Sequence, residues 1–275
     1  MKLKLSKGIT LALLLAFIGL APLKSNADVI TLSLVADASG SIPDADFNLQ
    51  IGAYTSIFGS GSFYDTYLNP GDTLYANFIW FSTAVEELVP FTAITDNASA
   101  SSFATNIGNT ATLAARGATV FEPGSLWEPG NTTSTGPVTD LAVSTIAALG
   151  DVGADRQVID ISTDGVPTSP ADPVNAALTA AANANAAGIT VNAIGVAGVD
   201  TNFLDDFTTA GGGFFVTATD FTSFQSVLEE KLETELAPPP PPPPPPPSVP
   251  EPGMLGLFGI GLLGLGLARR RRVVA

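Results

Sequence analysis

The chain has 275 residues and a net charge of −15 at neutral pH, and it contains neither cysteine nor histidine. Without cysteine there is no disulfide framework and no thiolate chemistry, and without histidine there is no HExxH zinc site and no Ser-His-Asp relay. These absences exclude most hydrolase mechanisms.

Residues 1–27 have the pattern of a secretory signal peptide. Three lysines precede an apolar run over residues 9–20, and Ser25-Asn26-Ala27 supplies small residues at the two positions that signal peptidase reads. The apolar run is short for a retained membrane anchor. We therefore expect signal peptidase to act here and the mature chain to begin at Asp28.

An apolar strand over residues 29–36 is followed at once by Asp37-Ala38-Ser39-Gly40-Ser41. The strand is apolar enough to be buried on both faces, as central strands of parallel sheets are. Gly40 allows a sharp turn before a helix that begins near Pro43. Three oxygen ligands on one turn, at the carboxyl end of a central strand, suit a hard divalent cation.

Helices and strands alternate along the rest of the domain, which spans residues 28–236. Phe47, Ile51, Tyr54 and Phe58 recur at helical spacing and predict one buried helix face. The pattern predicts an α/β fold, a doubly wound, mainly parallel sheet with helices on both faces. In the first half we expect a helix to Phe58, a loop over 59–72, strands over 73–82 and 85–89, and a helix capped by Asp96 or Asn97 that runs through Ile107. A loop over 108–137 follows, then a helix over 137–149, a strand before Asp164 and a helix from Asp172 to Gly188. The last elements are strands over 189–196 and 213–217 around a helix over 203–210, and a final helix marked by Phe221, Phe224, Leu228 and Leu232.

The loop over residues 108–137 is rich in glycine and proline and long for a compact domain. It lies between the two halves of the expected site. It is therefore either a variable rim that selects the partner or a tolerated insertion.

The last part of the chain, from residue 237, has the order of a sorting signal. A proline-rich spacer over residues 237–249 precedes Pro250-Glu251-Pro252, an apolar stretch over 253–268 and four arginines, Arg269 to Arg272. Polyproline is stiff and extended, and the arginines fit the rule that basic residues stay cytoplasmic. Residues 250–275 resemble the PEP-CTERM signal, which implies transient membrane anchoring by a short transmembrane span and recognition by an exosortase.

Without both ends, the chain is strongly acidic. Residues 28–248 contain 25 acidic and only 3 basic side chains, a net charge of about −22. Such a surface argues against nucleic acid as a partner. It suits a soluble exported protein and the binding of cations.

The pentapeptide Asp37-Ala38-Ser39-Gly40-Ser41 resembles the Asp-x-Ser-x-Ser motif of von Willebrand factor type A (vWA) domains, whose metal-ion-dependent adhesion site (MIDAS) binds Mg²⁺. The resemblance covers residues 28–236. It implies two further ligands, a threonine from a second loop and an aspartate from a third. Asp164, in Thr163-Asp164-Gly165 after an apolar strand, matches the aspartate.

The threonine is less clear, because the chain departs from the family's usual Gly-Gly-Thr. Thr133 has Gly136 three residues on and a helix directly after it, as in the family, whereas Thr119 has Glu122 at that spacing. We prefer Thr133 to Thr119. The neighbouring Thr132 is a third candidate.

The expected metal ligands are therefore Asp37, Ser39, Ser41, Thr133 and Asp164. Carboxylate and hydroxyl oxygens favour Mg²⁺, with Mn²⁺ or Ca²⁺ as alternatives. The resemblance implies an exported adhesion protein of the cell envelope or extracellular matrix, not an enzyme, that binds an acidic protein ligand or an exopolysaccharide component. The alternatives are a structural matrix protein with a vestigial metal site and a metal-assisted hydrolase, for which only spare carboxylates could act as general base.

Overall fold

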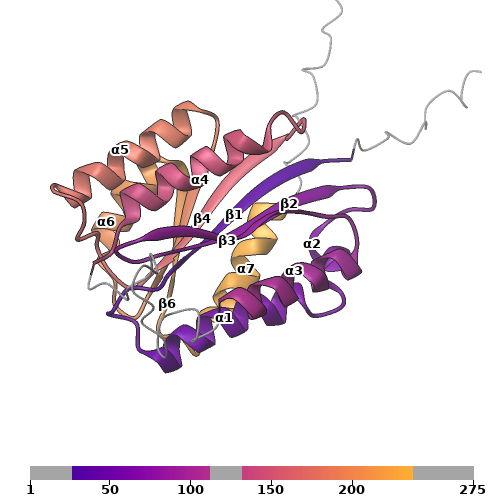
Figure 1. The fold of residues 1–275 in the computed structure, drawn as a ribbon, viewed down its shortest axis with the longest axis horizontal. Helices are drawn as coiled ribbons and strands as arrows, with labels where there is room; N and C mark the ends of the chain where they lie inside the picture. Colours follow the sequence, from indigo (N-terminus) through magenta and orange to yellow (C-terminus); the bar gives the residue numbers. More distant parts are fainter. Residues whose placement is uncertain (1–26, 112–131, 238–275) are drawn as a thin grey trace, which may run out of the picture. The chain divides into compact units, whose positions relative to one another are not determined.

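The computed structural model describes residues 27–111 and 132–237, which form a six-stranded sheet between two layers of helices (Figure 1). The strands lie in the order β3-β2-β1-β4-β5-β6, and only the edge pair β2–β3 is antiparallel. This confirms the predicted fold class. The strands are β1 (Val29–Asp37), β2 (Thr73–Phe81), β3 (Val85–Ile94), β4 (Arg156–Thr163), β5 (Thr190–Val196) and β6 (Gly212–Ala218).

The helices divide between the two faces of the sheet, each over its own apolar cluster. One face carries α1 (Asp44–Phe58), α2 (Phe63–Tyr67), α3 (Asn97–Thr110) and α7 (Phe224–Leu236). The other carries α4 (Thr135–Leu149), α5 (Pro173–Ala186) and α6 (Thr201–Ala210). Because helices cover both faces, β1 is buried almost throughout, as its apolar sequence predicts.

The aromatic face of α1 forms much of the first core layer. Phe47, Tyr54 and Phe58 are fully buried, and the ring of Tyr54 meets the edges of Phe78 and Phe224. Edge-to-face aromatic pairs stabilise a core beyond the burial of their area. The prediction that these aromatic residues are core residues is confirmed.

Several elements differ from the sequence prediction, and α3 runs three residues past its predicted end at Ile107. α2 lies inside the expected loop 59–72, where Phe63 stacks on Phe58 at 4.2 Å between ring centroids. β3 runs five residues further than predicted, past Pro90, which an edge strand tolerates because one side of it has no partner strand. α4 begins at Thr135, so Pro137 lies in its first turn, where no backbone N–H partner is required.

Two predicted helix caps have different outcomes. Asp96 caps α3 as expected, and its side chain accepts a hydrogen bond from the backbone N–H of Ser99. Asp172 precedes α5 as predicted, but it has a left-handed backbone (φ 57°) and makes no side-chain capping bond. The start of α5 therefore rests on Pro173 and on packing.

The strand order reverses between β1 and β4, which lie side by side at the centre of the sheet. In open α/β sheets the carboxyl ends of the strands at such a reversal form the binding crevice. This end of the sheet carries the residues that follow both strands, including Asp37 and Asp164.

Chain contacts divide the protein into one compact unit up to Pro238 and a second unit from Pro239, and all described residues belong to the first. Most of the expected rim loop lies outside the described residues. Within residues 27–111 and 132–237 no helix has the length and apolar character to cross a bilayer. The predicted span over residues 253–268 is not among them.

Candidate metal site

Asp37 is the last residue of β1, and its side chain is fully buried. Both of its carboxylate oxygens accept hydrogen bonds. Oδ1 accepts a hydrogen bond from the backbone N–H of Ser39 at 2.8 Å, and Oδ2 accepts one from the Thr163 hydroxyl at 2.7 Å. The Gln50 side chain donates to the Asp37 carbonyl at 3.2 Å. The carboxylate is thus fixed between the ends of β1 and β4.

Ser39, Ser41 and Asp164 form a continuous chain of oxygen atoms across two loops. The hydroxyls of Ser39 and Ser41 are 3.0 Å apart, and Ser41 Oγ donates to Asp164 Oδ1 at 2.8 Å. Ser41 is exposed and Asp164 is half-buried, so the chain runs from the buried end of β1 to the surface. The structure brings together four of the five predicted ligands.

Thr133, the fifth predicted ligand, is tied to the loop that follows β4. Its backbone N–H donates to the Thr168 hydroxyl at 2.8 Å, and its carbonyl accepts from the Thr168 N–H at 2.9 Å. Thr133 is 5% exposed. Among the described contacts, none joins its hydroxyl to the other predicted ligands.

The two alternative threonines are placed differently. The hydroxyl of Thr132 lies 2.7 Å from that of Thr83, in the turn between β2 and β3. Thr119 lies outside the described residues.

Burial raises the pKa of both carboxyl groups at this site. The pKa of Asp37 is raised to about 6, because burial outweighs the hydrogen bonds from Thr163 and Ser39 and the charge of Asp164 adds to the rise. The pKa of Asp164 is also raised by burial, against the hydrogen bond from Ser41. Each carboxylate is therefore costly to keep charged, and a nearby cation would favour its charged form.

The oxygen–oxygen distances of this chain are those of ordinary O–H···O hydrogen bonds, and they are also compatible with a small divalent cation. In an octahedral site with Mg–O bonds of about 2.0–2.1 Å, neighbouring ligand oxygens lie about 2.9 Å apart. The two contacts that join Ser39, Ser41 and Asp164 are 3.0 and 2.8 Å. A cation of this size would accept lone pairs from the same oxygens at similar separations, with the hydroxyl protons turned away from it. In the described part of the chain no three acidic, histidine or cysteine side chains gather in one place, so a metal here depends on the hydroxyls.

Sequence reasoning missed three residues that support the site. Thr163 and Gln50 hold Asp37, and Thr168 holds Thr133. Thr163 could have been found, because it precedes Asp164 at the end of a strand adjacent to β1. The spacing of Gln50 and Thr168 in the sequence carries no such signal.

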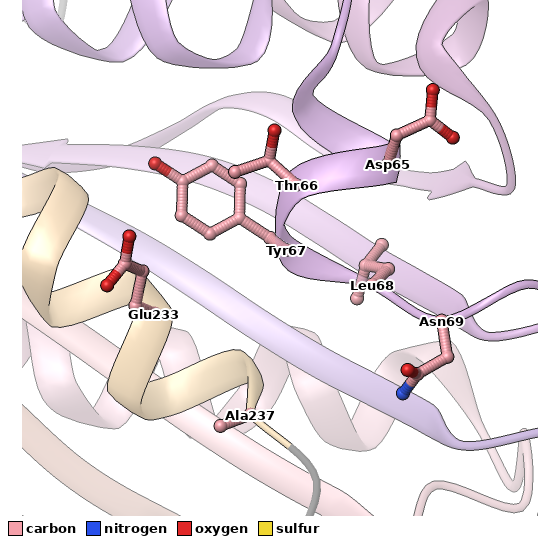
Figure 2. A pocket seen from close by; sticks show the side chains of 7 residues that line it. All are labelled: Asp65, Thr66, Tyr67, Leu68, Asn69, Glu233 and Ala237. Atoms are coloured by element: carbon pink, nitrogen blue, oxygen red, sulfur yellow. The ribbon is translucent and has the colours of Figure 1, made fainter.

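A surface pocket of about 320 Å³ lies between α2 and the carboxyl end of α7 (Figure 2). Its lining includes Tyr67 and Glu233, and burial together with the charges of Glu229 and Glu233 raises the pKa of Tyr67. None of its lining residues is a predicted metal ligand. The candidate site therefore remains the end of the sheet.

Comparison with solved structures identifies the fold. Similar structures include proximal thread matrix protein 1 from the mussel byssus with a zinc-occupied MIDAS motif (TM-score 0.51, 18% identity, 77% of this chain and 48% of that chain). They also include the SpaC pilus adhesin of Lactobacillus rhamnosus GG (0.56, 12%, 77% and 31%) and a von Willebrand factor type A protein from Catenulispora acidiphila (0.53, 13%, 76% and 43%). The chain spans about half the length of the byssus protein. At these identities the likeness shows the fold alone, which is of the vWA type.

Sequence comparison finds matches for the domain and for the carboxyl-terminal tail. No curated protein matches the sequence. The PEP-CTERM protein-sorting motif matches residues 248–272, which confirms the predicted sorting signal. The motif indicates export, sorting to the cell envelope or surface through the carboxyl-terminal tail, and processing by an exosortase. The family described as "Protein of unknown function (DUF1194)" matches residues 27–240, most of the chain, and the protein belongs to this family.

Proposed function

We propose that this exported protein is a non-catalytic adhesion protein that binds Mg²⁺ through Asp37, Ser39, Ser41, Thr133 and Asp164. The ion holds an acidic group of a partner in the cell envelope or extracellular matrix. Mn²⁺ or Ca²⁺ can take its place. The observation that carries the proposal is the chain of oxygens from Ser39 through Ser41 to Asp164, which joins the loops at the carboxyl ends of the central strands β1 and β4.

The charges of the donors suit a bridging ion. Asp37 and Asp164 together balance a divalent cation, while the hydroxyls add dipoles without further charge. The ion therefore keeps an affinity for one more anionic ligand. Because the domain is strongly acidic, an acidic partner would be repelled without the ion.

The similarity to known proteins also supports an adhesive role at the cell envelope. The sorting motif brings the protein to the cell envelope, where an adhesive contact would act. Two of the similar structures are a byssus matrix protein with zinc in its MIDAS motif and a pilus adhesin.

A pull-down from the envelope and exopolysaccharide fraction, with Mg²⁺ or with a chelator, tests the proposal. The wild-type protein should retain a partner only with Mg²⁺. Ser41→Ala should lose it, because the variant removes the hydroxyl that joins the two loops. Ser102→Ala, which removes an exposed hydroxyl on α3, is the matched control and should bind as the wild type does.

Metal binding can be measured apart from the partner. Calorimetry of the protein should show one divalent ion bound, and Mg²⁺ should raise the melting temperature because it binds only the folded state. Absence of both effects would contradict the metal site and favour a structural matrix protein with a vestigial motif. Turnover of a substrate panel would instead favour the hydrolase alternative.

A further inference from the structure

The amino end of the domain is held by a buried carboxylate. The backbone nitrogen of Asp28 donates a hydrogen bond to Asp72 Oδ1 at 2.8 Å. Asp72 follows the turn from Asn69 and is only 4% exposed. Asn69 donates to the other oxygen, Oδ2, from its backbone at 2.8 Å and from its side chain at 3.1 Å.

All three partners of this carboxylate are neutral N–H groups. Within residues 27–111 and 132–237 the ion pairs involve only Arg156 and Lys231 as cations, and neither is paired with Asp72. A buried carboxylate without a cation carries a desolvation cost that neutral hydrogen bonds offset only in part. Among residues 27–111 and 132–237, the Asp72 carboxylate therefore has no positively charged partner.

Signal-peptide removal would supply that charge at the required atom. The small residues Ser25-Asn26-Ala27 place the expected cut between Ala27 and Asp28. Hydrolysis of this amide by one water leaves a carboxylate on Ala27 and turns the Asp28 nitrogen into a primary amine, which is protonated at neutral pH. Ala27 is exposed, so its removal breaks no buried packing.

We propose that Asp72 is the docking site for the new amino terminus, so that cleavage after Ala27 converts a neutral hydrogen bond into a partly buried ion pair that stabilises the exported domain. A charged hydrogen bond is about twice as strong as a neutral one and contributes roughly 1 kcal/mol more, equivalent to about a fivefold change in an unfolding equilibrium constant. The ion pair forms only after the signal peptide is removed. This inference is independent of the metal site.

The proposed ion pair lies beside the start of β1 and the end of α7. The Asp28 carbonyl accepts from the Thr73 N–H at 2.9 Å, which begins the pairing of β1 with β2. The Asp28 side chain lies 3.6 Å from Arg156, whose guanidinium also donates to the carbonyls of Glu235, Leu236 and Ala237 at the end of α7. The new terminus would therefore be held where the first and last elements of the domain meet.

The test begins with the natural protein. N-terminal sequencing of the exported form should give Asp28 as the first residue, and a different first residue would overturn the proposal. Two chains are then compared in detergent, one starting at Asp28 and one at Ala27, both ending at Ala275. The Asp28 chain should unfold with an equilibrium constant about fivefold lower.

The variant Asp72→Asn, made in both chains, should abolish the difference between them. Equal stability of the two wild-type chains, or a difference that persists in the variant, would refute the pair. If the variant does not fold, acetylation of the wild-type α-amine replaces it. The only other primary amine from Asp28 onward is the buried Lys231, so the reaction can be made selective. Acetylation should lower the melting temperature, and an unchanged value would contradict the proposal.

Discussion

At the scale of single residues, the candidate site combines two kinds of oxygen. Asp37 is buried and fixed by Ser39 and Thr163, whereas Ser41 is exposed. The buried carboxylate supplies charge that does not move, and the exposed hydroxyl lies where a partner can approach. Preorganised ligands of this kind lose little conformational freedom when a metal binds.

The choice of threonine can be tested by substitution. Thr133→Ala should weaken Mg²⁺-dependent partner binding by about tenfold or more, a loss typical of metal-site residues, while Thr119→Ala should change it little. The reason is that Thr133 lies two residues before α4 and is held by the loop that carries Asp164. Both affinities would be measured by titration against the captured partner.

Thr132→Ala tests the third candidate and should change binding little, because its hydroxyl contacts Thr83. A loss as large as that of Thr133→Ala would make Thr132 the ligand. A larger loss in Thr119→Ala than in Thr133→Ala would transfer the assignment to Thr119.

Sequence alone could predict which side chains of the candidate site come together. Asp37, Ser39 and Ser41 form one local motif, and Asp164 directly follows an apolar strand, so these positions follow from the sequence pattern. The partner of Thr133 could not be predicted, because Thr168 meets it only after α4 and β4 have folded. A single helical element, the short α2, was missed for the same reason, since its contact with Phe58 is tertiary.

At the scale of elements, the site depends on how closely α4 approaches α5. A Cβ placed on Gly136 would lie 3.0–3.1 Å from backbone atoms of Ala176 and Ala177, so only glycine fits there without a shift. Gly136 lies three residues after Thr133. The close contact therefore fixes the helix end next to the candidate ligand.

Gly136→Ala should destabilise the protein by roughly 1–3 kcal/mol, because the added methyl group overpacks two backbones. It should also weaken Mg²⁺ binding, since α4 must move away from α5. Denaturant unfolding and calorimetry measure the two effects. Gly52→Ala in α1 is the control, because its Cβ would meet nothing within 4 Å, and it should stabilise the helix by up to about 1 kcal/mol. Equal effects of the two variants would contradict the packing argument.

At the scale of the whole molecule, β4 and α7 are joined by a buried charge cluster on the face away from α5. Lys231 lies 2.5 Å from Asp160 and also contacts Glu235, and all three side chains are fully buried. Asn192 donates to Glu235 at 2.6 Å. One ammonium thus faces two buried carboxyl groups, which can both be charged only with an unbalanced negative charge inside the domain.

This cluster predicts a pH dependence of stability. Burial and the charge of Asp160 raise the pKa of Glu235 to about 7, against the opposing pull of Lys231. Since the folded state then binds the proton more tightly than the unfolded state, the stabilisation from this proton is full below pH of about 4.5 and is lost as pH rises through about 7. Glu235→Gln stays neutral and should gain stability relative to the wild type over that range.

Melting curves from pH 4.5 to 8 measure the difference, with Glu230→Gln on the exposed side of the same helix as control. The control should follow the wild type at a constant offset. Parallel curves for Glu235→Gln and the wild type would show that Glu235 does not titrate in this range.

The sorting tail sets the last expectation for the whole molecule. Its apolar stretch, residues 253–268, is 16 residues long, whereas a stable span of a bilayer takes about 20. From the sequence we expect a span of this length, followed by Arg269–Arg272, to act as a temporary anchor. The anchor would thus keep the exported chain at the membrane until an exosortase cuts it.

Mass spectrometry of the surface protein should then find no peptide that contains Arg269–Arg272 in a strain with the exosortase. Deletion of the enzyme should leave the complete tail in the membrane fraction, because the arginines resist transfer across the bilayer. An intact tail on surface-displayed protein in the unmodified strain would mean that the motif acts as a permanent anchor. In that case the 16-residue apolar stretch would be long enough for stable insertion. Extending it by four leucines should then give no gain in membrane retention.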